Sequence, residues 1–163
     1  MGILTQDMMR VVREQRLGYV ATVSADGTPN LSPKGTTTVW DDDHLVFADI
    51  CSPGTVANLE RNPAIELNVV DPIARRGYRF KGRATIFADG PQFAAGQDFY
   101  RRVHALDEAI VARIRAIVLI TVERAAPLIS PIYDLGVTQS EVEARYQAYY
   151  DGLRNGRQAA TRA

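Results

Sequence analysis

Short runs of β-forming residues, separated by turn residues, fill most of the chain up to Val122. The run at residues 19–24 is followed by Asp26-Gly27, a dipeptide typical of tight hairpin turns. An acidic triplet at residues 41–43 separates two further runs, because three adjacent carboxylates do not fit a sheet interior. The predicted strands cover residues 19–24, 29–31, 36–40, 44–49, 65–70, 78–87 and 116–122.

These strands follow one another mainly through hairpin turns, without a helix after each strand. A layered α/β sheet would need such crossover helices. The pattern therefore predicts a mainly β fold with peripheral helices, built as a closed or nearly closed antiparallel barrel of about six to seven strands. Closure would also remove the unpaired edges that such strands otherwise expose.

Apolar residues at helical spacing predict helices around this barrel. The C-terminal one has a capping-box pattern, since Glu141 follows Thr138 at the third position. The predicted helices cover residues of about 5–15, 55–61, 91–113 and 139–155, and Gly96 is expected to weaken or break the third. Residues of about 157–163 carry no pattern, so we expect a disordered tail. The absence of a linker or repeat predicts a single domain over residues 1–163.

Composition narrows the classes of partner. Of 163 residues, 46% are hydrophobic and 23% are charged, which is ordinary for one globular domain with a core. The 19 basic and 19 acidic residues cancel to a net charge of zero, so no overall positive field attracts nucleic acid or an anionic membrane. The longest apolar run, residues 116–122, is far shorter than the roughly 20 residues that cross a bilayer. We therefore expect a small-molecule ligand, with no nucleic acid and no membrane as partner.

The single cysteine, Cys51, excludes an internal disulfide, and no basic start with an apolar stretch marks a secretory signal. A cytoplasmic location is the simplest expectation. His44 and His104 form no metal motif of known spacing, so no metal site is expected. A catalytic triad is equally unsupported, and no catalytic residue is assigned.

One stretch, residues 48–59, has the composition of an anion site. A predicted strand ends there in a helix that begins with Ser52 and Pro53, residue types favoured at a helix start. Free amides and the helix dipole favour negative charge at this end, and the hydroxyls of Ser52 and Thr55 can donate to phosphate oxygens. Asn58, one turn later, could reach the same ligand. In the simpler alternative, Ser52 caps its own helix and no ligand binds.

Lys34 lies in a strand that is interrupted by Pro33 and Gly35, both unfavourable inside a regular sheet. Incomplete pairing would leave backbone groups free to bond the polar edge of a flat heterocycle. Gly35 would allow close approach and Lys34 would offer a cation. A β-bulge with a solvated lysine is the alternative.

Three cations, Arg79, Lys81 and Arg83, alternate along one predicted strand and so project from one face. They could hold a phosphate or an anionic substrate, or they could form a solvent-facing row paired with acidic neighbours. With Tyr78 and Phe80, the same strand could also serve a barrel that binds nucleic acid on a stacking platform. The net charge of zero argues against that last alternative.

Four blocks, in their order and spacing, resemble the pyridoxamine 5′-phosphate oxidase-like family of FMN-binding split barrels. The blocks are residues 18–30, 32–35, 48–59 with Asn62-Pro63, and 77–85, together about 70 residues. The resemblance implies a split barrel, a homodimer, and two FMN molecules in clefts between the subunits. Residues 130–134 are similar to a subgroup of the same family.

Carried over position by position, the resemblance implies a set of cofactor contacts. Along the isoalloxazine ring and ribityl chain would lie Ser32, Pro33, Lys34 and Gly35, with Ala48 and Asp49 beside them; at the phosphate, Ser52, Thr55 and Asn58; and, from one or other subunit, Lys81. Many relatives have a basic residue at the position of Gly54 or Thr55, for which Lys34 or Arg79 could substitute. The C-terminal tryptophan and arginine-histidine motif of the true oxidases is absent, since Trp40 is the only tryptophan, so oxidation of vitamin B6 itself is not expected.

The resemblance therefore implies an FMN-binding flavoprotein, an oxidoreductase that moves a hydride between FMN and a small organic substrate or reduced nicotinamide. The reacting atoms would belong to the cofactor, while the protein would orient it and tune its potential. Lys34, near the pyrimidine edge, would stabilise negative charge on the reduced flavin. Two alternatives stay open: an F420-dependent reductase of the same fold, and a non-catalytic flavin-binding or redox-sensing protein.

Overall fold

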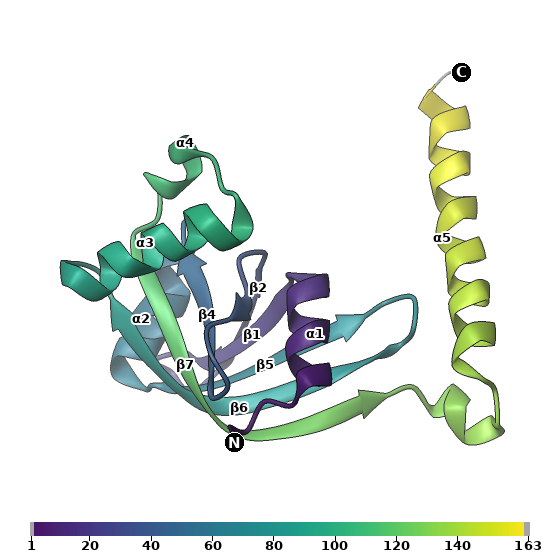
Figure 1. Cartoon of the computed structure of the whole chain (residues 1–163), viewed down its shortest axis with the longest axis horizontal. Helices are drawn as coiled ribbons and strands as arrows, with labels where there is room; N and C mark the ends of the chain where they lie inside the picture. The colour runs from purple at the N-terminus through teal and green to yellow at the C-terminus, as the bar shows by residue number, and fades with distance from the viewer. Residues whose placement is uncertain (1, 162–163) are drawn as a thin grey trace.

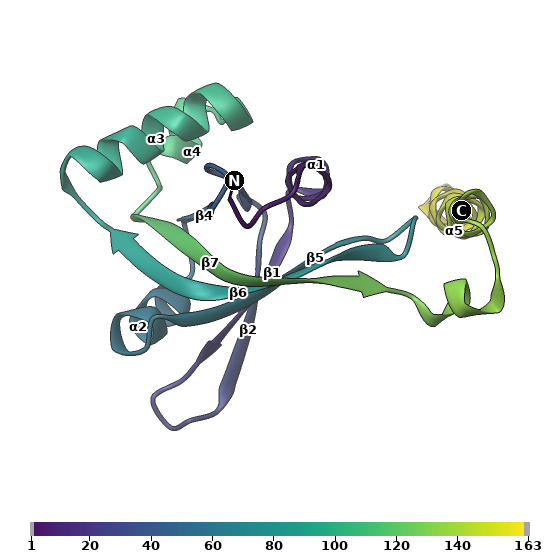
Figure 2. The same ribbon diagram turned by 60° about the horizontal axis from the view of Figure 1, so that its bottom comes forward.

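The computed structural model describes residues 2–161, with side chains for residues 2–156. Seven strands form one sheet with antiparallel pairings, in the order β2-β1-β5-β6-β7-β4-β3 (Figure 1). The strands are β1 (Gly18–Val23), β2 (Pro29–Lys34), β3 (Thr38–Val39), β4 (His44–Asp49), β5 (Ala64–Asp71), β6 (Arg76–Phe87) and β7 (Ala116–Ile129). The sheet curls on itself (Figure 2), so the predicted antiparallel split barrel of six to seven strands is confirmed.

The two edges of the sheet, β2 and β3, follow each other directly in the sequence. They are separated by residues 35–37 alone. Strands this close in sequence usually pair with each other, whereas here they end the sheet on opposite sides. The gap of the split barrel, between β2 and β3, is therefore spanned by the short turn of residues 35–37.

Side chains that alternate along the strands build the barrel core. In β1, for example, Val20 is buried and Tyr19 is exposed. The helix α1 (Gln6–Gln15) packs against the sheet and adds Met9, Val11 and Val12 to the same core. The largest fully buried members of this core are Phe47, Phe80, Leu45, Leu67 and Ile120.

A second core lies beneath α3 (Gly90–His104) and α4 (Glu108–Val111), with Tyr100 fully buried in it. α3 approaches β7 so closely that a Cβ on Gly96 would lie 2.4 Å from Ile117 Cγ1. The expectation that Gly96 breaks the helix is therefore wrong, because its missing side chain permits this packing. The single helix predicted over residues 91–113 ends instead at Ala105, which adopts a left-handed conformation with φ of 48°.

After β7, the 3₁₀ helix η1 (Pro131–Leu135) leads to α5 (Gln139–Thr161), which stands apart from the barrel in both views (Figures 1 and 2). Its base is anchored, since Val142 is fully buried and the Arg75 guanidinium lies 4.9 Å from the Tyr146 ring centroid.

α5 runs past its predicted end near residue 155 and into the tail that was expected to be disordered from about 157. A single glycine, Gly156, costs a helix only about 1 kcal/mol relative to alanine, and no proline follows it. Residues 162 and 163 of that tail lie outside the described residues. Within the described part of the chain, no helix has the length and apolar character needed to cross a membrane.

We expect Gly82→Ala to destabilise the barrel. Gly82 follows a register shift in the pairing of β6 with β7, and a Cβ there would lie 2.0 Å from the Thr121 carbonyl oxygen. Overpacking of this kind costs about 1–3 kcal/mol, which urea unfolding followed by circular dichroism would measure. The control is Gly152→Ala in α5, where a Cβ meets no atom within 4 Å. Equal loss of stability in the two variants would contradict this account.

Candidate functional site

The ammonium group of Lys34 lies where β2 meets the start of α2 (Pro53–Arg61). Lys34 is the last residue of β2 and is 4% exposed. Its Nζ donates hydrogen bonds to Ser32 Oγ at 2.6 Å, Ser52 Oγ at 2.8 Å and Thr55 Oγ1 at 3.2 Å. Lys34 is thus not the solvated lysine of the alternative interpretation.

The alternation of β2 explains how these groups meet. Ser32 and Lys34 project from the same face of the strand because side chains alternate with a period of two. Pro33, between them, is exposed on the opposite face. The first turn of α2 supplies the other two hydroxyls, with Ser52 immediately before the helix and Thr55 in it. One ammonium group therefore joins a strand edge to a helix start.

The three hydroxyl groups around Lys34 accept its hydrogen bonds and so keep their own protons. Among the described residues, no hydrogen bond uses those protons or the backbone amide of Gly54 in the first turn of α2. Ser32 and Ser52 are partly buried and Gly54 is exposed, so the cluster opens to the surface. This corner offers a cation and several free donors, a combination that suits an anion with several oxygens.

Burial lowers the pKa of Lys34, because removal from water disfavours the ammonium form, while the nearby Asp49 carboxylate opposes that shift. The Phe47 ring, with its centroid 5.7 Å from Nζ, adds a cation–π contact. An anion bound at the cluster would favour the ammonium form in the same way as Asp49.

Asp49, which is 2% exposed, fixes the start of α2. Its Oδ1 accepts from the Ser52 amide at 2.7 Å, and its Oδ2 accepts from the Arg115 guanidinium at 3.3 Å. The Ser52 side chain makes no capping bond to α2, so the alternative in which Ser52 merely caps its helix does not hold. Asp49 positions Ser52 through the backbone, and this leaves the Ser52 hydroxyl to Lys34.

Asn58 belongs to a neighbouring polar network rather than to the Lys34 cluster itself. Thr22 Oγ1 accepts from the Asn58 and Asn30 side-chain amides, each at 3.1 Å. Arg61 donates to Asn58 Oδ1 at 2.9 Å. Thr22, Asn30 and Arg61 were not among the predicted site residues. A signal was present, since Thr22 occupies an inward position of β1, where a buried hydroxyl needs a partner.

The turn between β2 and β3 is held by side-chain hydrogen bonds to its backbone. Thr36 Oγ1 accepts from the Ala48 amide at 2.9 Å and donates to the Ala48 carbonyl at 3.1 Å. Thr37 Oγ1 donates to the Lys34 carbonyl at 2.8 Å. Gly35 is exposed, and a Cβ there would meet no atom within 4 Å. The structure therefore brings Gly35 and Ala48 beside the Lys34 cluster.

Lys81 lies apart from that cluster within one chain. It is exposed on β6, and its Nζ lies 3.0 Å from Glu66 Oε2, while Arg79 bonds the other oxygen of the same carboxylate at 3.0 Å. Lys81 also lines an open groove of about 390 Å³ with residues of β1 and β5, none of which surrounds Lys34. Arg79, paired in this way, does not reach the first turn of α2.

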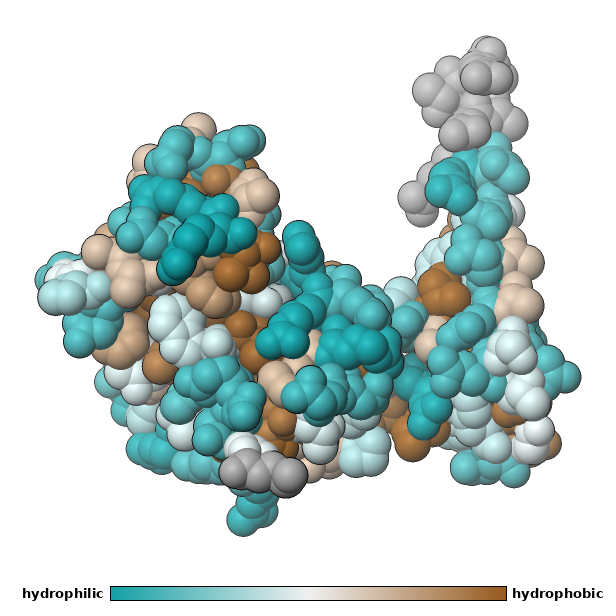
Figure 3. Space-filling model, in the orientation of Figure 1, coloured by the Kyte–Doolittle hydropathy of each residue, from teal (hydrophilic) through white to brown (hydrophobic). Residues whose placement is uncertain are grey.

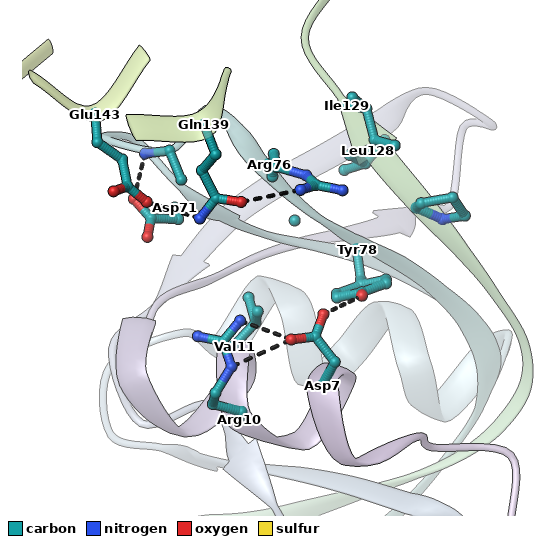
Figure 4. Close-up of a pocket in the computed structure, with 13 residues that line it drawn as sticks. Asp7, Arg10, Val11, Asp71, Arg76, Tyr78, Leu128, Ile129, Gln139 and Glu143 are labelled. Carbon is teal, nitrogen blue, oxygen red and sulfur yellow. Dashed lines mark hydrogen bonds and ion pairs between the residues drawn. The ribbon is translucent and has the colours of Figure 1, made fainter. Parts of the chain in front are cut away.

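A separate cavity of about 190 Å³ lies between α1, β6 and the base of α5 (Figure 4). Asp7 accepts hydrogen bonds there from the Tyr78 hydroxyl and from Arg10, and Arg76 donates to Gln139 Oε1 at 3.0 Å. The bond from Tyr78, followed by that from Arg10, lowers the pKa of Asp7. Because Asp7 of α1 hydrogen-bonds to Tyr78 of β6, this cluster joins α1 to the sheet.

Comparison with known proteins identifies the family. The sequence model of pyridoxamine 5′-phosphate oxidase matches residues 4–129. The chain belongs to this family. The match runs from the residue before the Thr5 cap of α1 to the end of β7, and it contains every cofactor-binding residue that the sequence predicts. η1 and α5 follow it.

Solved structures of this family's fold are similar to the chain. HupZ of Group A Streptococcus has 33% identity and a TM-score of 0.67, over 77% of this chain and 94% of HupZ. An F420 reductase has 25% identity and a TM-score of 0.59, over 75% of this chain and 98% of that protein. An FMN-binding protein from Syntrophomonas wolfei shares the fold, with 13% identity and a TM-score of 0.57, over 75% of this chain and 86% of its own. Comparison with curated proteins finds no match.

We expect Lys34 to contribute a distinctive pH dependence of stability. Because its pKa is lowered from 10.5 on folding, the unfolded chain binds more protons between the two values, and stability rises with pH across that window. Urea unfolding across the alkaline range should therefore show wild type gaining stability relative to Lys34→Met as the pH rises. The control is Arg83→Met, which removes an exposed cation of β6, leaves Lys34 in place and should run parallel to wild type. Parallel profiles for all three proteins would contradict the prediction.

Proposed function

We propose that this protein binds FMN and is an oxidoreductase that transfers a hydride between the flavin and a small organic substrate or reduced nicotinamide. The observation that carries the proposal is the buried Lys34 ammonium ringed by the hydroxyls of Ser32, Ser52 and Thr55. In a chain of this family, a cation at a helix start, surrounded by hydroxyls whose own protons are free, is a suitable site for the phosphate end of a flavin nucleotide.

The donors at this corner match the terminal phosphate of FMN. A phosphate monoester carries nearly two negative charges at neutral pH and has three strong acceptor oxygens. The ammonium supplies compensating charge, the three hydroxyls and the Gly54 amide supply protons, and the dipole of α2 adds a partial positive charge. The Asp49 carboxylate does not compete for these donors, because its oxygens are engaged by the Ser52 amide and Arg115.

In this proposal, Lys34 replaces the basic residue that many relatives have in the first turn of α2, where this chain has Gly54 and Thr55. Its Nζ reaches that turn from β2, 3.2 Å from Thr55 Oγ1. Arg79, the other candidate, is paired with Glu66. Lys34 therefore serves the phosphate of the flavin rather than its pyrimidine edge.

The other predicted residues bind and orient the flavin. The exposed backbone at Pro33 and Gly35 borders its ring, and the backbone of Ala48, held by Thr36, keeps that border fixed. Asn58 supports the start of α2 from the Thr22 network. FMN supplies the hydride chemistry when bound, so no side chain of this chain needs to act as an acid or base.

The second candidate is an F420-dependent reductase, because a structure with 25% identity to this chain is an F420 reductase. F420 carries its phosphate as a diester, which has two free oxygens and a single charge. The Lys34 cluster would therefore meet less negative charge and one oxygen fewer in F420 than in the phosphate monoester of FMN. A flavin-binding or redox-sensing protein without turnover is the third candidate.

We also propose that the protein is a homodimer with the flavin cleft at its interface, to which Lys81 of the second subunit contributes. Large apolar side chains are exposed on the outer face of the β1–β2 hairpin: Tyr19, Val23 and Leu31. α5 also has exposed apolar and aromatic side chains, among them Leu153, Tyr149 and Tyr150. Figure 3 shows a hydrophobic spot on this helix. Exposed apolar faces of this kind are typical of protein–protein contacts.

We expect the purified protein to bind FMN, and Lys34→Met to bind it weakly. Lys34 supplies the compensating charge and holds the three hydroxyls that would bond the phosphate, and interactions of this kind with a charged group are worth about 1.5–3 kcal/mol, so the dissociation constant should rise roughly 10- to 100-fold. Quenching of FMN fluorescence would measure both constants. Arg83→Met, which removes an exposed cation from β6, is the control and should bind as wild type does.

The same experiment separates the candidates. Preference for F420 over FMN in parallel titrations would favour the second candidate. If FMN binds but neither reduced nicotinamides nor small organic donors reduce it, the third candidate, a protein without turnover, is favoured. If neither cofactor binds, the proposed function fails.

We expect sedimentation of the wild-type protein at micromolar concentration to show dimers, and Leu31→Asp to shift them to monomers. Leu31 is 67% exposed on β2, and a charge placed there would be buried by the second subunit. FMN affinity should fall together with dimerisation, since the cleft is shared. Leu135→Asp, at an 80% exposed position of η1, is the control. Wild-type monomers that bind FMN would contradict the shared cleft.

A further inference from the structure

We infer that Tyr100 is a positioning residue for the proposed flavin site, acting through the turn between β2 and β3. Tyr100 belongs to α3, outside every block that carries the sequence resemblance, and contributes no group to the Lys34 cluster. The inference rests on the proposed function, because it concerns how the flavin border is held. It adds a residue and a hydrogen-bond path to that function.

The Tyr100 hydroxyl has a fixed position. The residue is fully buried, and its hydroxyl donates to the Thr36 carbonyl at 2.9 Å. Burial raises the pKa of Tyr100, so the phenol stays protonated and remains a donor. The helix behind it is held against β7 by the close approach of Gly96 to Ile117. A buried donor on a rigid helix thus points at one carbonyl of the turn.

In the turn at residues 35–37, the carbonyls of Lys34 and Thr36 accept hydrogen bonds, whereas the peptide unit that joins Gly35 to Thr36 makes none with any described residue. The Thr36 carbonyl is held by Tyr100, and the Lys34 carbonyl is held by Thr37 through its amide at 3.2 Å and its hydroxyl at 2.8 Å. Peptide units are planar and trans, so a carbonyl fixed inward fixes the following N–H outward. The N–H of Gly35 is directed in this way by the Lys34 carbonyl.

The Gly35–Thr36 peptide unit and the adjacent Gly35 N–H are suited to the polar edge of a flavin ring. Among the described residues, no hydrogen bond uses the amides of Gly35 and Thr36 or the carbonyl of Gly35. Two donors and one acceptor, beside the Lys34 cluster on a segment where Gly35 is exposed and Thr36 partly exposed, complement the carbonyl and N–H groups of a pyrimidine ring. Donors fixed in advance also stabilise negative charge that develops on reduction. By anchoring Thr36, Tyr100 keeps these groups in place.

The test compares Tyr100→Phe with Tyr133→Phe in the full-length protein. Each change removes one tyrosine hydroxyl that donates to a backbone carbonyl, because Tyr133 bonds the Ala74 carbonyl at 2.6 Å near η1. We expect Tyr100→Phe to raise the FMN dissociation constant on the order of 3- to 10-fold, the equivalent of one hydrogen bond. It should also shift the visible flavin bands and make the flavin harder to reduce. Tyr133→Phe should change none of these.

A second pair of variants tests the same path from the other side. Thr36→Val removes the hydroxyl that holds Ala48 and should reproduce the effects of Tyr100→Phe, whereas Thr36→Ser keeps that hydroxyl and should behave as wild type. If Tyr100→Phe fails to fold, this pair still tests whether the turn positions the flavin: an unchanged Thr36→Val would overturn the path through which Tyr100 acts, and an effect of Thr36→Val without one of Thr36→Ser would support it.

Each outcome bears on one proposal or on both. If wild type binds FMN and folded Tyr100→Phe leaves its affinity, bands and potential unchanged, the positioning role is overturned, whatever Thr36→Val does, and the proposed function stands. Equal effects of Tyr133→Phe would also overturn it, because they would reflect general loss of stability. If wild type binds no flavin, the proposed function and this inference fail together.

Discussion

A buried ammonium group has to be hydrogen-bonded, and in this protein that requirement ties two elements together. A charge removed from water costs several kcal/mol unless polar partners replace the lost hydration. Lys34 finds those partners in Ser32 on its own strand and in Ser52 and Thr55 at the start of α2. These hydrogen bonds hold β2 and α2 in one relative position. Without them, that position would depend only on the packing of apolar side chains in the core.

The sheet was predictable from the sequence because strand alternation and hairpin turns are local signals. The pattern around Asp26-Gly27 needs no knowledge of distant residues, and the hairpin lies there. Helix ends were less predictable. Gly96 suggested a break, yet tertiary contact with Ile117 makes it part of a continuous helix, and the true end at Ala105 depends on a left-handed conformation that alanine rarely adopts.

At the candidate site, the sequence identified the types of residue but not their partners. Ser52 and Thr55 followed from the chemistry of a helix start, and Lys34 from an interrupted strand. That these three meet, and that Lys81 pairs with Glu66 instead, depends on strand pairing and on the packing of α2. Asn30 and Arg61 were missed because single polar residues carry no motif, whereas the inward position of Thr22 was a signal that its neighbours in the sequence did not complete. Their importance comes from sharing hydrogen bonds in space.

One connection controls the geometry of the barrel opening: the three residues 35–37 between the edge strands β2 and β3. β2 ends immediately before the segment 35–37 and β3 begins immediately after it. An inserted or deleted residue there would change the width of the barrel opening, and it would also change which side chains of these strands face the core. Hairpin loops elsewhere can grow into solvent without such an effect. During evolution, changes of length in this chain would therefore be tolerated at the hairpin loops or beyond β7, while the short segment keeps its three residues.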